Sequence, residues 1–246
     1  MTMHQTAPAE HGVTWLTEGW TLFIQRPGLL VGMTLILLLI LAALNLVPLL
    51  GGLAALIMLV VLVAGLFTTL ERLHRGQEAG FDTLFSGLRE HTRPLLVLGL
   101  IFLGAEIIIA VLVGLVVSGT VIGSVLMGDI MSHGEMSPAM ILSIVQGGLA
   151  ALLLLLLLSL PLLMAYAFAV PLVCLRGHAP VAALKASFLA VAANWAPFLV
   201  YGLIYIVLAL LASIPLMLGW LLLLPLTVAS GYMAYREVFA DNAVLS

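Results

Sequence analysis

The chain has 246 residues, of which 64% are hydrophobic and only 8% are charged. A soluble domain carries roughly 25% charged residues, so this chain could not cover its surface with polar groups in water. The net charge of −3 gives no electrostatic basis for binding nucleic acid. The single cysteine, Cys174, excludes an internal disulfide and a multi-cysteine metal cage. Composition therefore predicts an integral membrane protein, for which lipid is the solvent.

The two ends of the chain differ from the rest in composition. Residues 1–12 are polar and lack the basic start and short apolar core of a cleaved signal peptide. We therefore expect residues 1–12 to form a disordered cytoplasmic tail and residues 241–246 to form a second cytoplasmic tail. Between them, residues 13–240 are predicted to form a single transmembrane domain.

Long apolar runs follow one another through this domain. A helix needs about 20 apolar residues to cross ~30 Å of hydrocarbon. Runs of this kind predict six spans, at residues 29–50, 53–73, 95–118, 139–175, 198–214 and 216–233. The fourth run is too long for one straight span, so either its start lies outside the hydrocarbon or Pro161 kinks it. Polar residues near its start favour the first alternative. The predicted fold is all-α.

The basic residues are confined to one set of connections between the spans. They are Arg26, Arg72, Arg75, Arg89, Arg93, Arg176, Lys185 and Arg236. Every one falls before the first span, at the end of the second or between it and the third, between the fourth and fifth, or after the sixth. This distribution follows the positive-inside rule, so we expect both termini to be cytoplasmic.

A short amphipathic stretch ending in a proline precedes the first, third and fifth spans. Residues 15–27, 81–94 and 181–197 each carry apolar side chains at helical spacing. The sequence therefore predicts three hairpins of two spans, each preceded by an interfacial helix. Tryptophan and arginine suit the headgroup layer. The predicted interfacial anchors are Trp15, Trp20, Arg26, Arg93, Trp195 and Arg236. These helices either bind a lipid surface or a cytoplasmic partner, or they only set the depth and tilt of the spans.

Glu106 is the candidate for an intramembrane polar site. It lies about 18 Å of helix beyond Pro94, near the middle of the bilayer. An ionised carboxylate there costs about 2.5–3.5 kcal/mol, so Glu106 must face protein, be protonated or meet water. The candidate partners are Tyr201, Tyr205, Gln146 and Asn45. The group either serves a proton or ion relay or a lipid-headgroup cavity, or holds helices together by a hydrogen bond.

The predicted outside loop is rich in methionine and contains one histidine. Its soft ligands are Met127, Met131, His133, Met136 and Met140. Thioether and imidazole groups suit Cu(I), so a copper site is one prediction for this loop. The alternative is that these methionines are adaptable apolar residues lying on the membrane interface.

Several segments resemble a known family. Residues 19–27 begin Gly-Trp-Thr-Leu-Phe and end Arg-Pro, residues 185–188 read Lys-Ala-Ser-Phe, and residues 194–198 read Asn-Trp-Ala-Pro-Phe. Residues 232–239 read Tyr-Met-Ala-Tyr-Arg-Glu-Val-Phe. With them, residues 14–240 resemble a family of proteobacterial inner-membrane proteins that has no assigned reaction. A more distant similarity is to the membrane domain that precedes the catalytic domain of some glycerophosphodiester phosphodiesterases. The sequence holds no such catalytic domain, so the resemblance implies an inner-membrane location and not that activity.

No catalytic signature is present in the sequence. It contains no H-E-x-x-H, P-loop, G-x-S-x-G or dinucleotide-binding pattern, so we do not expect an enzyme or a cofactor. The favoured function is a non-enzymatic scaffold or accessory subunit of a membrane complex. Its partners would be the lipid bilayer and either another membrane protein or a second copy of the chain. The alternatives are a small transporter or lipid-handling protein that uses Glu106, and a periplasmic copper site in the Met127–Met140 loop.

Overall fold

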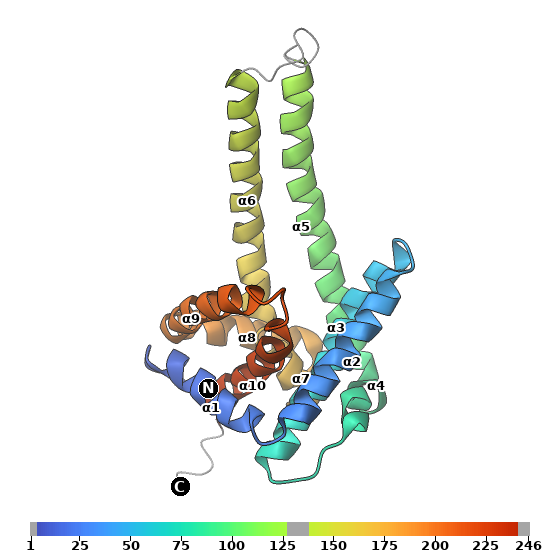
Figure 1. The fold of residues 1–246 in the computed structure, drawn as a ribbon, viewed down its shortest axis with the longest axis vertical. Coiled ribbons are helices and arrows are strands. Elements are labelled where there is room, and N and C mark those ends of the chain that lie inside the picture. The colour runs from blue at the N-terminus through green and yellow to red at the C-terminus, as the bar shows by residue number, and fades with distance from the viewer. Residues whose placement is uncertain (1–3, 127–137, 241–246) are drawn as a thin grey trace. The chain divides into compact units, whose positions relative to one another are not determined.

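The computed structural model describes residues 4–126 and 138–240, and within these residues the chain is helical with no strand (Figure 1). The predicted all-α fold is therefore confirmed. The helices are α1 (His11–Phe23), α2 (Pro27–Asn45), α3 (Leu50–His74), η1 (Phe81–Phe85), α4 (Ser86–Arg89), α5 (Thr92–Leu126), α6 (Pro138–Tyr166), α7 (Ala169–Arg176), α8 (Pro180–Ala193), α9 (Trp195–Ser213) and α10 (Trp220–Val238).

Five helical stretches in the described chain are long and apolar enough to cross a membrane. They are Pro27–Asn45, Leu50–His74, Thr92–Gly123, Ile141–Arg176 and Trp195–Ser213. The chain is thus a multi-span membrane protein. The run predicted as the sixth span, residues 216–233, corresponds to α10, which is not among these five. Its helix begins at Trp220 and continues into the charged residues Arg236 and Glu237.

The chain divides into two compact units, which we describe separately. The first unit consists of residues 1–101 and 164–246, and the second of residues 102–163.

Helix α1 packs against α9 and α10 in the first unit. Its buried face consists of Gly12, Trp15, Leu16 and Gly19, spaced one turn apart, together with the end of the helix. A Cβ atom on Gly19 would overlap the backbone of Ser230 in α10. The amphipathic pattern therefore marks a face that is covered by other helices of the same unit.

The segment before α1 differs from the disordered tail predicted for residues 1–12. The backbone N–H of Gln5 donates to the carbonyl of Val238 at 2.8 Å, and α1 already begins at His11. Hydrogen bonds of Gln5 and Ala7 to distant segments hold this polar stretch in the structure. Its composition does not show those bonds.

Helices α2 and α3 form a hairpin around a buried apolar cluster. The cluster consists of Met33, Leu37, Leu62, Leu66 and Leu84. Leu84 comes from η1, so this short helix and α4 close one side of the α2–α3 pair. Glycines in α3 and α4 permit the close approach, since a Cβ on either Gly65 or Gly87 would overlap a backbone carbonyl.

The long fourth apolar run is divided into α6 and α7 by a break at residues 167–168. Ser187 of α8 stabilises this break. The N–H of Phe168 donates to Ser187 Oγ at 2.9 Å, and Ser187 Oγ donates to the carbonyl of Met164 at 2.8 Å. The hydroxyl thus replaces hydrogen bonds that a continuous helix would make. Pro161 lies inside α6 and does not end it.

The second unit contains the main parts of α5 and α6. The two helices are in close contact at Gly147, where an added Cβ would overlap the side chain of Thr120. In the most apolar window of each stretch, only 6% of the residues are buried within the protein. Such an exposed apolar surface suits contact with lipid or with another membrane protein.

Candidate functional site

Glu106 lies in the second unit and is half-buried on α5. Its carboxylate makes no hydrogen bond or ion pair with a residue that the structure describes. Gln146 belongs to the same unit, is exposed, and precedes the glycine that contacts Thr120. Thr120 is about 21 Å along α5 from Glu106, so Gln146 is far from the level of Glu106.

The other three predicted partners of Glu106 lie in the first unit. Tyr201 shares a hydrogen bond of 2.8 Å with Ser230 Oγ, and its ring stacks on that of Tyr205 with centroids 6.2 Å apart. Asn45 is exposed and donates to the carbonyl of Leu41, one turn earlier in its own helix. The structure therefore brings Tyr201 and Tyr205 together and gives Asn45 a local role.

The candidate copper site falls largely outside the described residues. Met127, Met131, His133 and Met136 are not described, and Met140 is described only as part of the backbone of α6. In the described segments, no three His, Cys, Asp or Glu side chains are grouped so that they could hold a metal ion.

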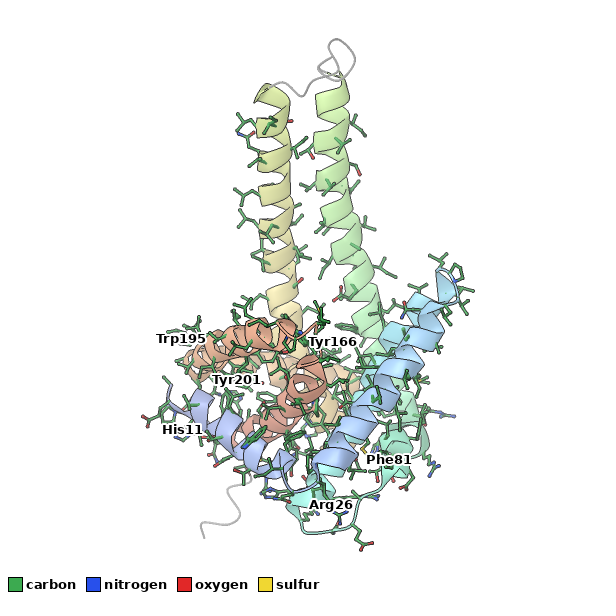
Figure 2. All side chains as sticks on the ribbon, viewed as in Figure 1. His11, Arg26, Phe81, Tyr166, Trp195 and Tyr201 are labelled. Carbon is green, nitrogen blue, oxygen red and sulfur yellow. The ribbon has the colours of Figure 1, made fainter. Side chains whose placement is uncertain are left out.

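The predicted interfacial anchors are placed in two different environments. Trp20 and Trp195 are 48% and 66% exposed, and the arginines Arg26, Arg93 and Arg236 are also exposed. Trp195 and Arg26 are labelled in Figure 2. Trp15 is fully buried, at 0% exposure, between α1 and its neighbours in the first unit. Trp15 therefore fastens helices to one another, and its ring is not available to lipid.

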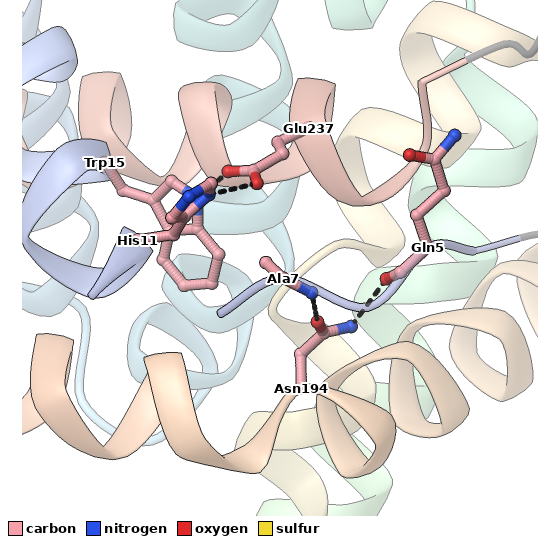
Figure 3. A network of polar contacts seen from close by, with 6 residues as sticks. All are labelled: Gln5, Ala7, His11, Trp15, Asn194 and Glu237. Atoms are coloured by element: carbon pink, nitrogen blue, oxygen red, sulfur yellow. Dashed lines mark hydrogen bonds and ion pairs between the residues drawn. The ribbon is translucent and has the colours of Figure 1, made fainter. Parts of the chain in front are cut away.

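A network of polar contacts connects α1 to the end of α10 (Figure 3). The indole N–H of Trp15 donates to Glu237 Oε2 at 2.5 Å, and His11 Nδ1 lies 2.5 Å from Glu237 Oε1. Both carboxylate oxygens of Glu237 are thus used by one helix. Aromatic contacts extend the junction, because the Trp15 ring also lies 5.1 Å from that of Phe198.

Asn194, at the junction of α8 and α9, forms hydrogen bonds with the segment that precedes α1. Its Oδ1 accepts from the N–H of Ala7 at 2.7 Å, and its Nδ2 donates to the carbonyl of Gln5 at 2.9 Å (Figure 3). Asn194 is only 1% exposed, so these bonds satisfy a side chain that water does not reach.

A second carboxylate connects α3 to α10. The hydroxyl of Tyr232 donates to Glu71 Oε2 at 2.6 Å, while Arg75 pairs with Glu71 Oε1 at 2.5 Å. Tyr232 is fully buried, and its ring also lies 5.9 Å from that of His74. Glu71 therefore joins a buried phenol to an exposed guanidinium.

Arg176 connects α7 to the same end of α10. Its guanidinium lies over the ring of Tyr235 at 5.7 Å, and its Nη2 donates to the carbonyl of Phe239. The ring of Phe239 in turn meets that of Phe168 edge-on, with centroids 5.5 Å apart. The segment at residues 232–239 is thus the point at which α1, α3 and α7 are joined.

The groups that make these connections are Glu71, Glu237, Asn194 and Ser187, and none of them was a candidate site residue in the sequence. Three of them lie in or beside the segments that carry the family resemblance. A polar residue inside an otherwise apolar helix end is the signal that could have found them. Comparison with known proteins supplies no further guide, because no family model, curated protein or solved structure matches the chain.

Proposed function

We propose that the chain is a non-enzymatic scaffold or accessory subunit of a membrane complex. The observation that carries this proposal is a contrast between polar and apolar groups. The polar side chains at the ends of α3, α8 and α10 join helices of the chain to one another, whereas most of the apolar surface of α5, α6 and α9 is uncovered. A bacterial inner membrane is the proposed location, in agreement with the family resemblance.

The hydrogen bonding of the two chain ends supports an even number of crossings. Gln5 bonds to Val238 within the first unit, and we therefore propose that both ends of the chain lie on the same side of the membrane. Five crossings would put them on opposite sides. We therefore propose α10 as a sixth crossing, arranged with α9 as a hairpin. The positive-inside distribution of the basic residues then puts both ends in the cytoplasm.

The hydrogen bonds and ion pairs of Glu71 and Glu237 support a structural role for the proposed cytoplasmic end of the protein. Each oxygen of Glu71 and each oxygen of Glu237 has a protein partner within 2.6 Å. A general base or a cation ligand must instead have an oxygen available to its substrate. These carboxylates therefore favour a protein that binds other proteins over one that carries out a reaction at this end.

Photo-crosslinking in native membranes tests the scaffold proposal. A photoreactive phenylalanine analogue is placed at Ile108, which is 61% exposed, and separately at the neighbouring Ile109, which is 6% exposed. We expect the probe at Ile108 to give a discrete crosslinked band with a second protein, and the probe at Ile109 to give none. If the probes at Ile108 and at the equally exposed Leu160 and Leu163 of α6 capture lipid alone, and no stoichiometric partner copurifies, the proposal fails.

A further inference from the structure

Helices α5 and α6 meet at one described contact in the second unit. Their contact at Thr120 and Gly147 sets one level of the hairpin. Because the helices are antiparallel, residues at equal distances from this contact lie at similar levels. Glu106 and Pro161 are each fourteen residues from it, or about 21 Å of helix. Fourteen residues make nearly four turns, so both return close to the side of the helix that faces the other at the contact.

The level of Glu106 is deficient in hydrogen-bond donors. Pro161 has no N–H, so the carbonyl of Leu157 cannot accept its usual helical hydrogen bond. Glu106 adds a carboxylate that makes no hydrogen bond or ion pair with a described residue. Both groups are acceptors, and the only other polar side chain within a turn of Glu106 or Pro161 is the uncharged hydroxyl of Ser159 in α6. A cation at this level would complement the carboxylate, since a bilayer offers none.

The chain itself has no cation to offer at this level. All eight of its Lys and Arg residues lie outside the middle of the predicted spans. A second copy of the chain has the same limitation, so it cannot supply the missing charge. An acidic residue within a span characteristically pairs with another group or lines a water-filled path, because its burial in lipid costs about 2.5–3.5 kcal/mol.

The geometry points to a docking site for a transmembrane helix of a different protein, which carries a Lys or Arg in the middle of its span. Its basic side chain pairs with Glu106, and its apolar side chains cover the exposed surface beside it, including Ile107 and Ala110. This inference rests on the proposed scaffold function, and it adds the chemistry by which the partner is recognised. Charge complementarity at mid-depth selects the partner, since apolar contact alone does not distinguish one span from another.

A synthetic membrane-spanning peptide tests the charge directly. Polyleucine peptides with one central Lys, or with Leu in its place, are mixed with the purified chain in vesicles of phosphatidylcholine and phosphatidylglycerol. Energy transfer from a label at the C-terminus of the chain measures association. We expect the Lys peptide to bind about 5- to 30-fold more tightly than the Leu peptide, the range that an interhelical polar contact in a membrane provides.

Substitution of Glu106 separates the charge from the shape of the site. Glu106→Gln should abolish the preference for the Lys peptide and leave binding of the Leu peptide unchanged, which also shows that the variant is folded. Glu90→Gln, on the connection before α5, is the matched control and should retain the preference. A peptide with its Lys moved to one end should behave like the Leu peptide. Equal binding of the Lys and Leu peptides to the wild-type chain, or a preference that survives Glu106→Gln, overturns the inference.

The crosslinking experiment distinguishes this inference from the scaffold proposal. The probe is therefore also placed at Ala110, which is exposed and lies one turn from Glu106 on the same face of α5. A partner that crosslinks at Ala110 equally in the wild type and in Glu106→Gln supports the scaffold and overturns pairing with Glu106. Loss of that crosslink in Glu106→Gln, together with tighter binding of the Lys peptide than of the Leu peptide to the wild type, supports both the scaffold proposal and the pairing with Glu106. If no partner crosslinks, the scaffold proposal fails, and the peptide preference then decides the chemistry of Glu106. Association of two copies that depends on Glu106, without a preference for the Lys peptide, also overturns the inference.

Discussion

Trp15 in α1 donates its indole N–H to Glu237 near the end of α10, across 222 residues of sequence and a distance of 2.5 Å. Trp15 is fully buried, so no water can replace this acceptor. His11 lies against the other oxygen of the same carboxylate. One side chain therefore holds the first helix of the chain against the last.

Glu237→Ala should destabilise the first unit by about 1–3 kcal/mol, because it leaves the buried N–H of Trp15 without an acceptor. Trp15→Phe should lose less through hydrogen bonding, since Glu237 keeps its contact with His11, but the smaller ring also leaves a cavity at a fully buried site. The free energy of unfolding in detergent micelles, from titration with a denaturing detergent, measures both. Glu18→Ala is the control, because Glu18 is exposed on α1, and it should change stability by less than about 0.5 kcal/mol. Equal effects of Glu18→Ala and Glu237→Ala would contradict the role of the carboxylate.

Tyr232→Phe should lower the free energy of unfolding by about 1.5–3 kcal/mol, the range for a hydrogen bond to a charged group. It removes only the hydroxyl that donates to Glu71 at 2.6 Å. Tyr205→Phe is a matched change in the same unit, where the phenol stacks on Tyr201 but makes no described hydrogen bond. The same unfolding measurement should show little effect of Tyr205→Phe. A cost for Tyr232→Phe no larger than that for Tyr205→Phe would show that the bond to Glu71 contributes nothing.

Gly19→Ala should destabilise the packing of α1 on α10, since the new methyl group would overlap Ser230. Gly202→Ala is the control within α9, where an added Cβ meets no atom within 4 Å. Removing that helical glycine should stabilise the helix by roughly 0.5–1 kcal/mol through the reduced backbone freedom of the unfolded chain. In thermal unfolding, we therefore expect Gly19→Ala to lower the midpoint temperature and Gly202→Ala to raise it. A stabilising effect of Gly19→Ala would show that α1 does not approach α10 this closely.

The long apolar helices could be predicted from the sequence because length and hydropathy alone determine them. The surroundings of the amphipathic stretches could not be predicted from the sequence. A face of apolar residues at i, i+3, i+4 and i+7 has the same pattern whether lipid or protein covers it. Trp15 and Trp20 lie on the same short helix, yet one is buried against α10 and the other is half-exposed.

The break between α6 and α7 was missed for a different reason. Pro171 prevents the carbonyl of residue 167 from accepting a helical hydrogen bond, but the hydroxyl of Ser187 that stabilises the break comes from α8. The expected grouping of Tyr201 with Glu106 was based on depth along the helices and stays a prediction, while within the first unit Tyr201 bonds to Ser230. Depth can be calculated from the 1.5 Å rise of a helix, but the side on which two helices meet depends on tertiary packing.

Single-cysteine labelling tests the proposed sixth crossing. In a Cys174→Ala background, Leu216→Cys places a thiol in the turn between α9 and α10, where residue 216 is 90% exposed. If α10 crosses, a membrane-impermeant maleimide should label this thiol in cells whose outer membrane has been permeabilised and whose inner membrane is intact. Ala179→Cys, in the exposed turn between α7 and α8, should be labelled only after the inner membrane is opened.

The chain ends provide the second half of this test. His4→Cys and a cysteine added after Ser246 should both be protected in intact cells, since Gln5 and Val238 are hydrogen-bonded to each other. The decisive comparison is between residue 216 and the chain ends. Six crossings require that they be labelled from opposite sides, whereas four crossings, with α9 and α10 both on the cytoplasmic side, would protect all three thiols. Labelling of one chain end but not the other would instead contradict the pairing of the termini, and with it the even number of spans.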